Sequence, residues 1–199
     1  RDGEMNSQTS AVIFDLDGTL TRPHLDFDAI RAEIGIVNGP ILEAIERMDD
    51  SSRRRAEEIL LHHEWDAARN AVLYDGAVDV LRECRDHGLR TAVMTRNCRP
   101  IVDYLVRTHG LRFDAVRTRE DGAIKPSPEP VLSICRELGS DPRKSWVVGD
   151  YLFDILSGEA AGTRTVLMIG DGPEPEYADR ASHIIRSLGE LSSLVTVSP

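Results

Sequence analysis

The segment VIFDLDGTLT, residues 12–21, runs from apolar side chains directly into two aspartates, Asp15 and Asp17, that are one residue apart. With Ala11 in front, residues 11–16 have the length and composition of a buried β-strand. Gly18 then lets the backbone turn tightly. Like charges this close repel each other, so the end of this strand needs a partner of opposite charge.

Strand and helix signals alternate through most of the chain. Further strands are predicted at residues 90–94, 144–149 and 163–168, with a weaker one at 113–117. Apolar side chains at helical spacing predict helices, most of them ended by glycine, at residues 76–87, 99–109, 128–138 (with Ser127 as N-cap) and 152–161. This alternation predicts the α/β class, with a parallel sheet covered by helices on both faces.

Residues 22–75 interrupt the alternation because they contain no convincing strand. Helices are predicted there at residues 26–34, 40–48 and 52–72. We therefore expect a core made of residues 11–21 and 76–199, with a small helical insertion at 22–75. Residues 1–10 are polar and patternless, and we expect a disordered arm or a remnant of cloning.

Composition limits the possible partners. The formal net charge of −10 argues against nucleic acid or an anionic membrane as a ligand. No apolar run approaches the roughly eighteen residues that a transmembrane helix needs. The three cysteines form no CxxC pair, which is typical of a reducing compartment. No secretory signal is visible, so we expect a cytoplasmic protein, or a reducing organelle if an upstream transit segment was removed. The oligomeric state stays unknown.

Polar side chains follow the predicted strands. They are Asp15 and Asp17 after the first, Thr95, Arg96 and Asn97 after the second, Lys125 in a later loop, and Asp150 and Asp154 after the next. In an open parallel sheet, ligands bind at the carboxyl ends of the strands. We therefore expect these side chains to converge at one edge.

The carboxylates in this set are suited to a hard cation. Asp15, Asp17 and Asp150 would form an oxygen-rich site for Mg²⁺, which keeps several waters and shares its ligands with phosphate. The cation would neutralise the repulsion between the first two aspartates. Asp15 could then act as a carboxylate nucleophile.

The other residues suit phosphoryl transfer. Asp17 could protonate the leaving group and later activate water, and Thr95 could donate its hydroxyl to a phosphate oxygen. Only two of the 24 basic residues are lysines, Lys125 and Lys144. A compact ammonium at Lys125 fits a crowded phosphate site where a planar guanidinium would not.

DLDGTLT, TRN, KP and GDYLFD resemble, in order and spacing, the four motifs of the haloacid dehalogenase superfamily of hydrolases. The insertion at 22–75 resembles the helical cap of the subgroup that includes phosphoglycolate phosphatase and beta-phosphoglucomutase. The resemblance implies a Rossmann-like core, Mg²⁺ dependence and a phosphorylated Asp15. It also implies metal ligation by the Asp15 carboxylate, the Asp17 backbone carbonyl and the Asp150 carboxylate, with Asp154 as an outer ligand or support.

The resemblance also narrows the activity. Phosphonatases of this family use a lysine in the cap, and residues 22–75 contain none. The dehalogenases lack an aspartate at the position of Asp17, because a halide leaves without a proton. We therefore expect a Mg²⁺-dependent phosphatase for small phosphorylated metabolites.

Two alternatives remain open for the activity. The same core residues would serve a phosphomutase or phosphotransferase of sugar phosphates, and a non-catalytic phosphate-binding module would keep the same fold. Two motif residues, Arg96 and Asn97, are candidates for substrate contact or for loop structure. In the insertion, the run of Arg53, Arg54 and Arg55 is typical of a solvated helix face, although a phosphate clamp is conceivable.

Overall fold

A computed structural model describes residues 10–196 of the chain. These residues divide into two compact units: a core that comprises residues 10–22 and 72–196, and a cap, Pro23–Ala71. The cap begins one residue later and ends four residues earlier than the insertion predicted from the sequence. Among the described residues, none of the helices has the length and apolar character needed to cross a bilayer.

The core contains a six-stranded sheet in which every neighbouring pair is parallel. Its spatial order is β3-β2-β1-β4-β5-β6. The strands are β1 (Ala11–Phe14), β2 (Arg90–Met94), β3 (Ala115–Arg117), β4 (Trp146–Gly149), β5 (Arg164–Met168) and β6 (His183–Ile185). The predicted α/β class with a Rossmann-like sheet is confirmed.

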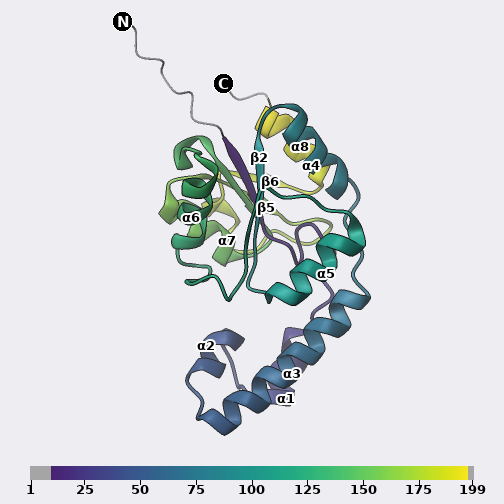
Figure 1. Ribbon diagram of the computed structural model, residues 1–199, viewed down its shortest axis with the longest axis vertical. Coiled ribbons are helices and arrows are strands. Elements are labelled where there is room, and N and C mark those ends of the chain that lie inside the picture. Colours follow the sequence, from purple (N-terminus) through teal and green to yellow (C-terminus); the bar gives the residue numbers. More distant parts are fainter. Residues whose placement is uncertain (1–9, 197–199) are drawn as a thin grey trace, which may run out of the picture. The chain divides into compact units, whose positions relative to one another are not determined.

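Helices cover both faces of this sheet, as Figure 1 shows, with α6 and α7 on one side and α4, α5 and α8 on the other. They are α4 (Ala77–Asp86), α5 (Arg99–His109), α6 (Glu129–Leu138), α7 (Leu152–Ala161) and α8 (Leu188–Thr196). Alternate residues of β1 point to opposite faces. Ala11 and Ile13 join an apolar cluster with α6, and their neighbours Val12 and Phe14 are equally buried. A strand buried on both faces explains the unbroken apolar run in the sequence.

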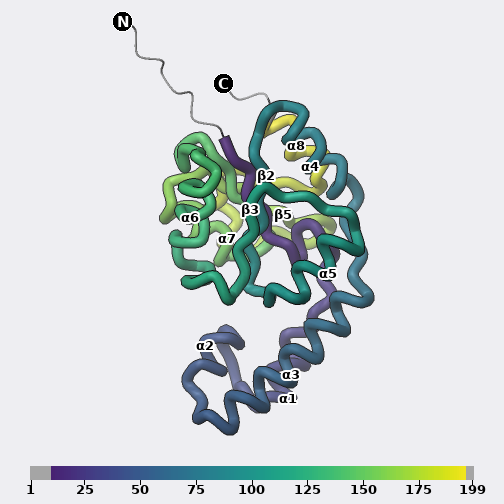
Figure 2. Tube along the Cα trace, in the orientation of Figure 1, coloured from purple at the N-terminus to yellow at the C-terminus, as the bar shows by residue number. Residues whose placement is uncertain are grey.

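The end of the chain was not predicted. β6 has only three residues, and two of them, His183 and Ile184, are exposed, so the segment lacks the apolar pattern of a central strand. After β6, α8 packs beside α4, which comes from a distant part of the sequence (Figure 2). At the other end of β4, the strand starts two residues later than predicted, because Pro142–Lys144 form a 3₁₀ turn.

The chain leaves the core and returns to it through two short segments that lie side by side. The backbone N–H of Arg22 donates to the Val72 carbonyl at 2.8 Å, and that of Tyr74 donates to the Leu20 carbonyl at 2.9 Å. Thr21 and Leu73 form an antiparallel bridge between them. These pairings assign residues 72–75 to the core, although the sequence prediction had placed them in the insertion.

The cap consists of three helices around its own apolar cluster. They are α1 (Phe27–Ile34), α2 (Ile41–Glu46) and α3 (Asp50–Arg69). Ile30, Ile41, Ile45, Ala56 and Leu60 are buried together at the centre. Asp49 caps α3, accepting hydrogen bonds from the backbone N–H groups of Ser51 and Ser52. Helical spacing of apolar residues thus fixes this small unit without a sheet.

Candidate active site

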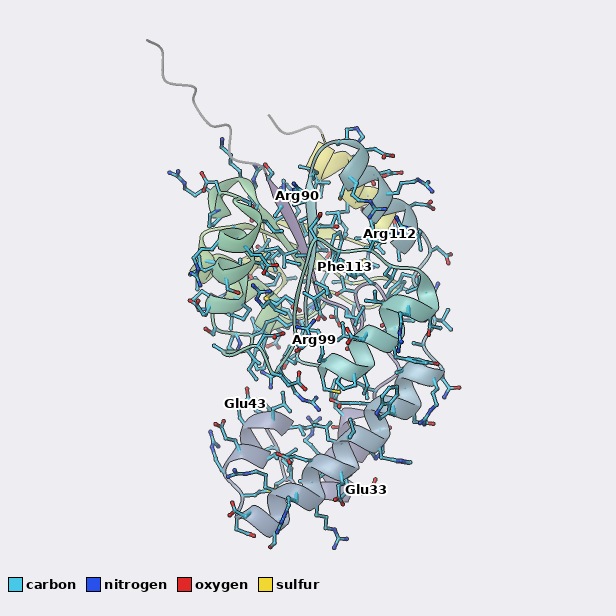
Figure 3. The ribbon with its side chains drawn as sticks, viewed as in Figure 1. Glu33, Glu43, Arg90, Arg99, Arg112 and Phe113 are labelled. Carbon is cyan, nitrogen blue, oxygen red and sulfur yellow. The ribbon has the colours of Figure 1, made fainter. Side chains whose placement is uncertain are left out.

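Strand order places the predicted site residues at one edge of the sheet. β1 pairs with β4, and this pairing continues past β1, where the Asp15 N–H donates to the Val148 carbonyl at 2.8 Å. Asp15 therefore lies close to Asp150, which directly follows β4. In Figure 3 the label Arg90 marks the start of β2, and Arg99, at the start of α5, lies toward its opposite, carboxyl end. The site is at this carboxyl end.

A buried lysine joins two of the carboxylates. The Lys125 ammonium Nζ lies 2.7 Å from Oδ1 of Asp15 and 2.6 Å from Oδ1 of Asp154. Only 4% of Lys125 is exposed. Burial acts to lower the pKa of Lys125, but the two carboxylates outweigh it and raise that pKa above its ordinary value. Lys125 is therefore a fixed positive charge beside Asp15.

Asp150 lies against the glycine turn of the first motif. Its Oδ1 accepts a hydrogen bond from the Thr19 hydroxyl at 3.2 Å. Gly18 has a φ of +89°, and a Cβ at this position would lie 2.3 Å from Asp150 Oδ2, so only glycine fits. Burial, followed by the Asp15 and Asp154 carboxylates, raises the pKa of Asp150 well above its ordinary value. Removal from water and two neighbouring carboxylates thus both favour a proton or a cation at Asp150.

Asp154 contacts both the site lysine and the backbone at the start of α7. It is fully buried at the start of α7, where its Oδ2 accepts from the Tyr151 backbone N–H at 3.1 Å. Burial raises the pKa of Asp154 to about 6, against the opposing effect of Lys125. A side chain at Gly149 would collide with Asp154, since its Cβ would lie 2.1 Å from the Asp154 Cγ. Asp154 is thus both a helix cap and a partner of Lys125.

The three carboxylates can hold a cation. One oxygen from each of Asp15, Asp150 and Asp154 lies within 4.8 Å of the others. Lys125 pairs with two of these three carboxylates, so the cluster holds more negative than positive charge. Hard oxygen ligands with excess negative charge suit Mg²⁺. The donor set therefore fits the predicted metal.

Asp17, Thr95 and Asn97 meet at the neighbouring strand end. Asn97 donates from Nδ2 to Oδ2 of Asp17 at 3.1 Å, and its backbone N–H donates to the Thr95 hydroxyl oxygen at 3.0 Å. Accepting this bond leaves the Thr95 hydroxyl proton able to donate to a ligand. Asp17 is only partly buried, unlike Asp15. All four motifs thus contribute to one region of the core.

Arg96 contacts the protein around the site. Its Nη1 donates to the Lys125 carbonyl at 2.6 Å, and its guanidinium lies 5.1 Å from the centroid of the Phe153 ring. These contacts tie the loop after β2 to the loop that carries Lys125. A substrate contact by Arg96 stays a prediction.

Sequence reasoning missed one polar neighbour of the carboxylates, Thr19. It is fully buried and binds Asp150, which lies 131 residues away in the chain. A threonine two residues after Asp17 is a recognisable signal, but a turn hydroxyl usually bonds locally. Only the proximity of β1 and β4 gives it this partner.

A parallel sheet with a buried lysine and an acidic cluster at its carboxyl edge defines an α/β enzyme with an oxygen-rich site. The sequence profile of haloacid dehalogenase-like hydrolases matches residues 9–162. The chain belongs to this family and is a hydrolase, which confirms the resemblance found in its motifs.

Curated relatives match over most of their length. Pyrophosphatase PpaX of Bacillus pumilus is 31% identical over 215 residues, which cover 96% of this chain and 99% of the relative. N-acetylmuramic acid 6-phosphate phosphatase of Pseudomonas aeruginosa is 33% identical over 183 residues, covering 78% and 79%. Among solved structures, a hydrolase from Pseudomonas syringae has a TM-score of 0.78 at 19% identity, covering 96% of this chain and all of that one. That likeness establishes the fold alone.

Proposed function

We propose that the protein is a Mg²⁺-dependent phosphatase that hydrolyses small phosphate monoesters through a phosphorylated Asp15. The observation that carries this proposal is the buried Lys125, which holds the Asp15 carboxylate beside Asp150 and Asp154 at the carboxyl edge of the sheet. A nucleophilic carboxylate with a fixed cation next to it is equipped to attack an anionic phosphoryl group.

Asp15 and Asp17 would share the chemical steps. An Asp15 carboxylate oxygen attacks phosphorus, the bond from phosphorus to the ester oxygen breaks, and Asp17 gives its proton to the departing alkoxide. In the second step Asp17 takes a proton from water, whose oxygen attacks phosphorus, and the bond from phosphorus to the Asp15 oxygen breaks. Inorganic phosphate and the free Asp15 carboxylate result. Proton transfer by a positioned side chain typically contributes about 10²–10⁴-fold to such a rate.

The remaining residues would bind and orient the phosphoryl group. Lys125 supplies a positive charge to its oxygens, and the Thr95 hydroxyl donates a hydrogen bond. Mg²⁺ would be held by the Asp15 carboxylate, the Asp17 backbone carbonyl and Asp150, with Asp154 outside them, and would supply further charge to the phosphoryl oxygens. Phosphoryl transfer depends mainly on such positioning and charge stabilisation.

The relatives support a phosphorylated substrate but differ in the group that carries the phosphate. One is named for pyrophosphate and another for N-acetylmuramic acid 6-phosphate. We therefore propose a substrate class, small phosphorylated metabolites, and no single compound.

Phosphate release from a panel of phosphate esters, together with pyrophosphate as an anhydride, tests the proposal. The panel contains phosphoglycolate, sugar phosphates, nucleotides, pyrophosphate and 4-nitrophenyl phosphate, each with Mg²⁺ and with a chelator. We expect release that depends on Mg²⁺, and Asp15→Asn should abolish it while circular dichroism shows a folded protein. Substantial turnover by Asp15→Asn would refute the covalent mechanism. Isomerisation of a sugar phosphate without phosphate release would instead support the mutase alternative.

A further inference from the structure

Asn97 is buried and held at several points in the turn between β2 and α5. Only 5% of the residue is exposed. Its backbone N–H donates to the Thr95 hydroxyl oxygen at 3.0 Å, and its carbonyl accepts from the Arg119 N–H at 3.2 Å. Its side chain then bridges Cys98 and Asp17. The residue is too constrained to move freely with a substrate.

The hydrogen bonds fix which way the Asn97 amide points. Its oxygen, Oδ1, accepts from the Cys98 backbone N–H at 2.8 Å. A backbone N–H can only donate, so the amide oxygen must face Cys98 and the NH₂ group must face the opposite way. That NH₂ group lies 3.1 Å from Oδ2 of Asp17. The amide cannot turn over without losing both bonds.

We propose that Asn97 is a positioning residue that holds Asp17 for proton transfer, an inference that rests on the proposed function. The amide NH₂ donates to Oδ2 of Asp17, and an oxygen that accepts such a bond is less basic than the other, so the arrangement favours a proton on Oδ1. The proton that Asp17 gives to the leaving group is therefore carried on Oδ1. Asn97 thus sets both the rotamer of the acid and the oxygen that carries the proton.

This role differs from direct contact with substrate. A residue that binds the phosphoryl group affects every ester alike, since all esters share that group. A residue that orients the general acid affects only those esters whose leaving group needs a proton. An alkyl phosphate releases a strongly basic alkoxide, whereas 4-nitrophenyl phosphate releases a stable anion that departs without protonation. The leaving group therefore distinguishes the two roles.

The experiment measures kcat/KM, which reports the steps through formation of phosphorylated Asp15. The substrates are 4-nitrophenyl phosphate and the best alkyl phosphate from the panel. For Asn97→Ala we expect kcat/KM on the alkyl ester to fall about 10–100-fold, part of the full contribution of an acid, and to fall about threefold or less on the aryl ester. Asp17→Asn should show the same preference with a larger loss.

Three further variants make the test decisive. Asn97→Asp is nearly isosteric and keeps an acceptor for the Cys98 N–H, but it replaces the NH₂ donor with a carboxylate oxygen that cannot donate to Asp17, so the loss on the alkyl ester should at least match that of Asn97→Ala. It also serves if Asn97→Ala does not fold. Asn38→Ala, at an exposed position in the cap, is the control and should leave kcat/KM unchanged for both substrates. In an Asp17→Asn background, Asn97→Ala should cause little further loss.

The inference would be overturned if Asn97→Ala lowered kcat/KM equally for both esters. It would also be overturned if Asn97→Ala caused its full loss in the Asp17→Asn background. In either case an inactive Asp15→Asn would leave the proposed function intact. An active Asp15→Asn would refute the proposed function itself, so the two failures can be told apart.

Discussion

The core and the cap differ in how many charged side chains they bury. The core buries Asp15, Lys125 and Asp154 at the edge of its sheet. Among the described residues of the cap, Glu64 is the one charged side chain that is buried, and the centre is apolar. The cap keeps its other charges on helix surfaces. Charges removed from water cost free energy unless they are paired or used.

This difference indicates that the catalytic groups lie in the core. A buried set of carboxylates is stable only if a cation or a proton compensates its charge, and such sites are typical of catalysis. A small helical unit with an apolar centre is explained by packing alone.

Lys125→Met should have the largest effect. It leaves Asp15 and Asp154 buried without their shared cation, which should cost about 3–5 kcal/mol in the free energy of unfolding and abolish turnover. The chain offers a matched control, because its second lysine, Lys144, is exposed. Lys144→Met should change stability by about 0.5 kcal/mol or less. Urea unfolding measures both, and similar values for the two variants would contradict the contrast.

Asp150→Asn should stabilise the protein without metal and destabilise it, relative to wild type, when Mg²⁺ is present. In the folded, metal-free protein the pKa of Asp150 is raised above 3.8, so this group binds protons more tightly when folded than when unfolded. Its contribution to stability is therefore present below about pH 4 and is lost as pH rises through the raised value. In metal-free buffer at pH 8, Asp150→Asn should be more stable than wild type, and the gain should vanish near pH 4.

Adding Mg²⁺ at pH 8 should make wild type the more stable of the two proteins. A ligand at 100 times its Kd stabilises the folded protein by about 2.7 kcal/mol, and the variant should lose most of this gain. Thermal unfolding with and without Mg²⁺ measures the difference. Equal stabilisation of both proteins would show that Asp150 does not hold the ion.

Arg53→Ala tests whether the arginine run of the cap is structural. Arg53 donates from Nη2 to the carbonyl oxygens of Glu46 at 2.8 Å and Met48 at 3.0 Å, at the end of α2. Losing both bonds should cost about 1–2 kcal/mol of stability. Arg54→Ala, at an exposed position, is the control and should be neutral. If Arg53→Ala instead raised KM without lowering stability, the phosphate-clamp alternative would gain support.

Glu33→Gln should have the smallest effect. Glu33 Oε2 lies 2.7 Å from His63 Nε2 and links α1 to α3, but both side chains are partly exposed. Exposed pairs contribute about 0.2–1 kcal/mol and are screened by salt. Urea unfolding at about pH 5, where an ordinary histidine is charged, should show in low and high salt a small loss that shrinks as salt rises. Glu57→Gln, also exposed on α3, provides the baseline; a loss that ignores salt would argue against an ionic contact.

Several elements could be predicted closely because their signals are local. β2, α5 and α7 have the predicted bounds, since each has an apolar pattern and a clear stop such as Gly110 or Gly162. β6 and α8 could not be predicted in this way. β6 is short and half exposed, and its place in the sheet depends on pairing with β5 rather than on its own composition.

The candidate site was likewise predictable only in its local features. The types and order of its residues, from Asp15 to Asp154, were readable because each motif is short and follows a strand. The partners were not readable. Lys125 meets Asp15 across 110 positions, and Asn97 meets Asp17 across 80, so no local pattern records either contact. The sequence alone also did not decide whether Asn97 contacts the substrate or stabilises the loop.

Chain-local patterns thus specify which strands and helices form and which chemical groups end each strand. They do so because backbone propensity and apolar spacing act over a few residues. The pairing of β1 with β4 then decides that Thr19 binds Asp150 and that one lysine serves two carboxylates. Those contacts, and the burial that raises the pKa of Asp150, arise only when distant segments pack together and exclude water.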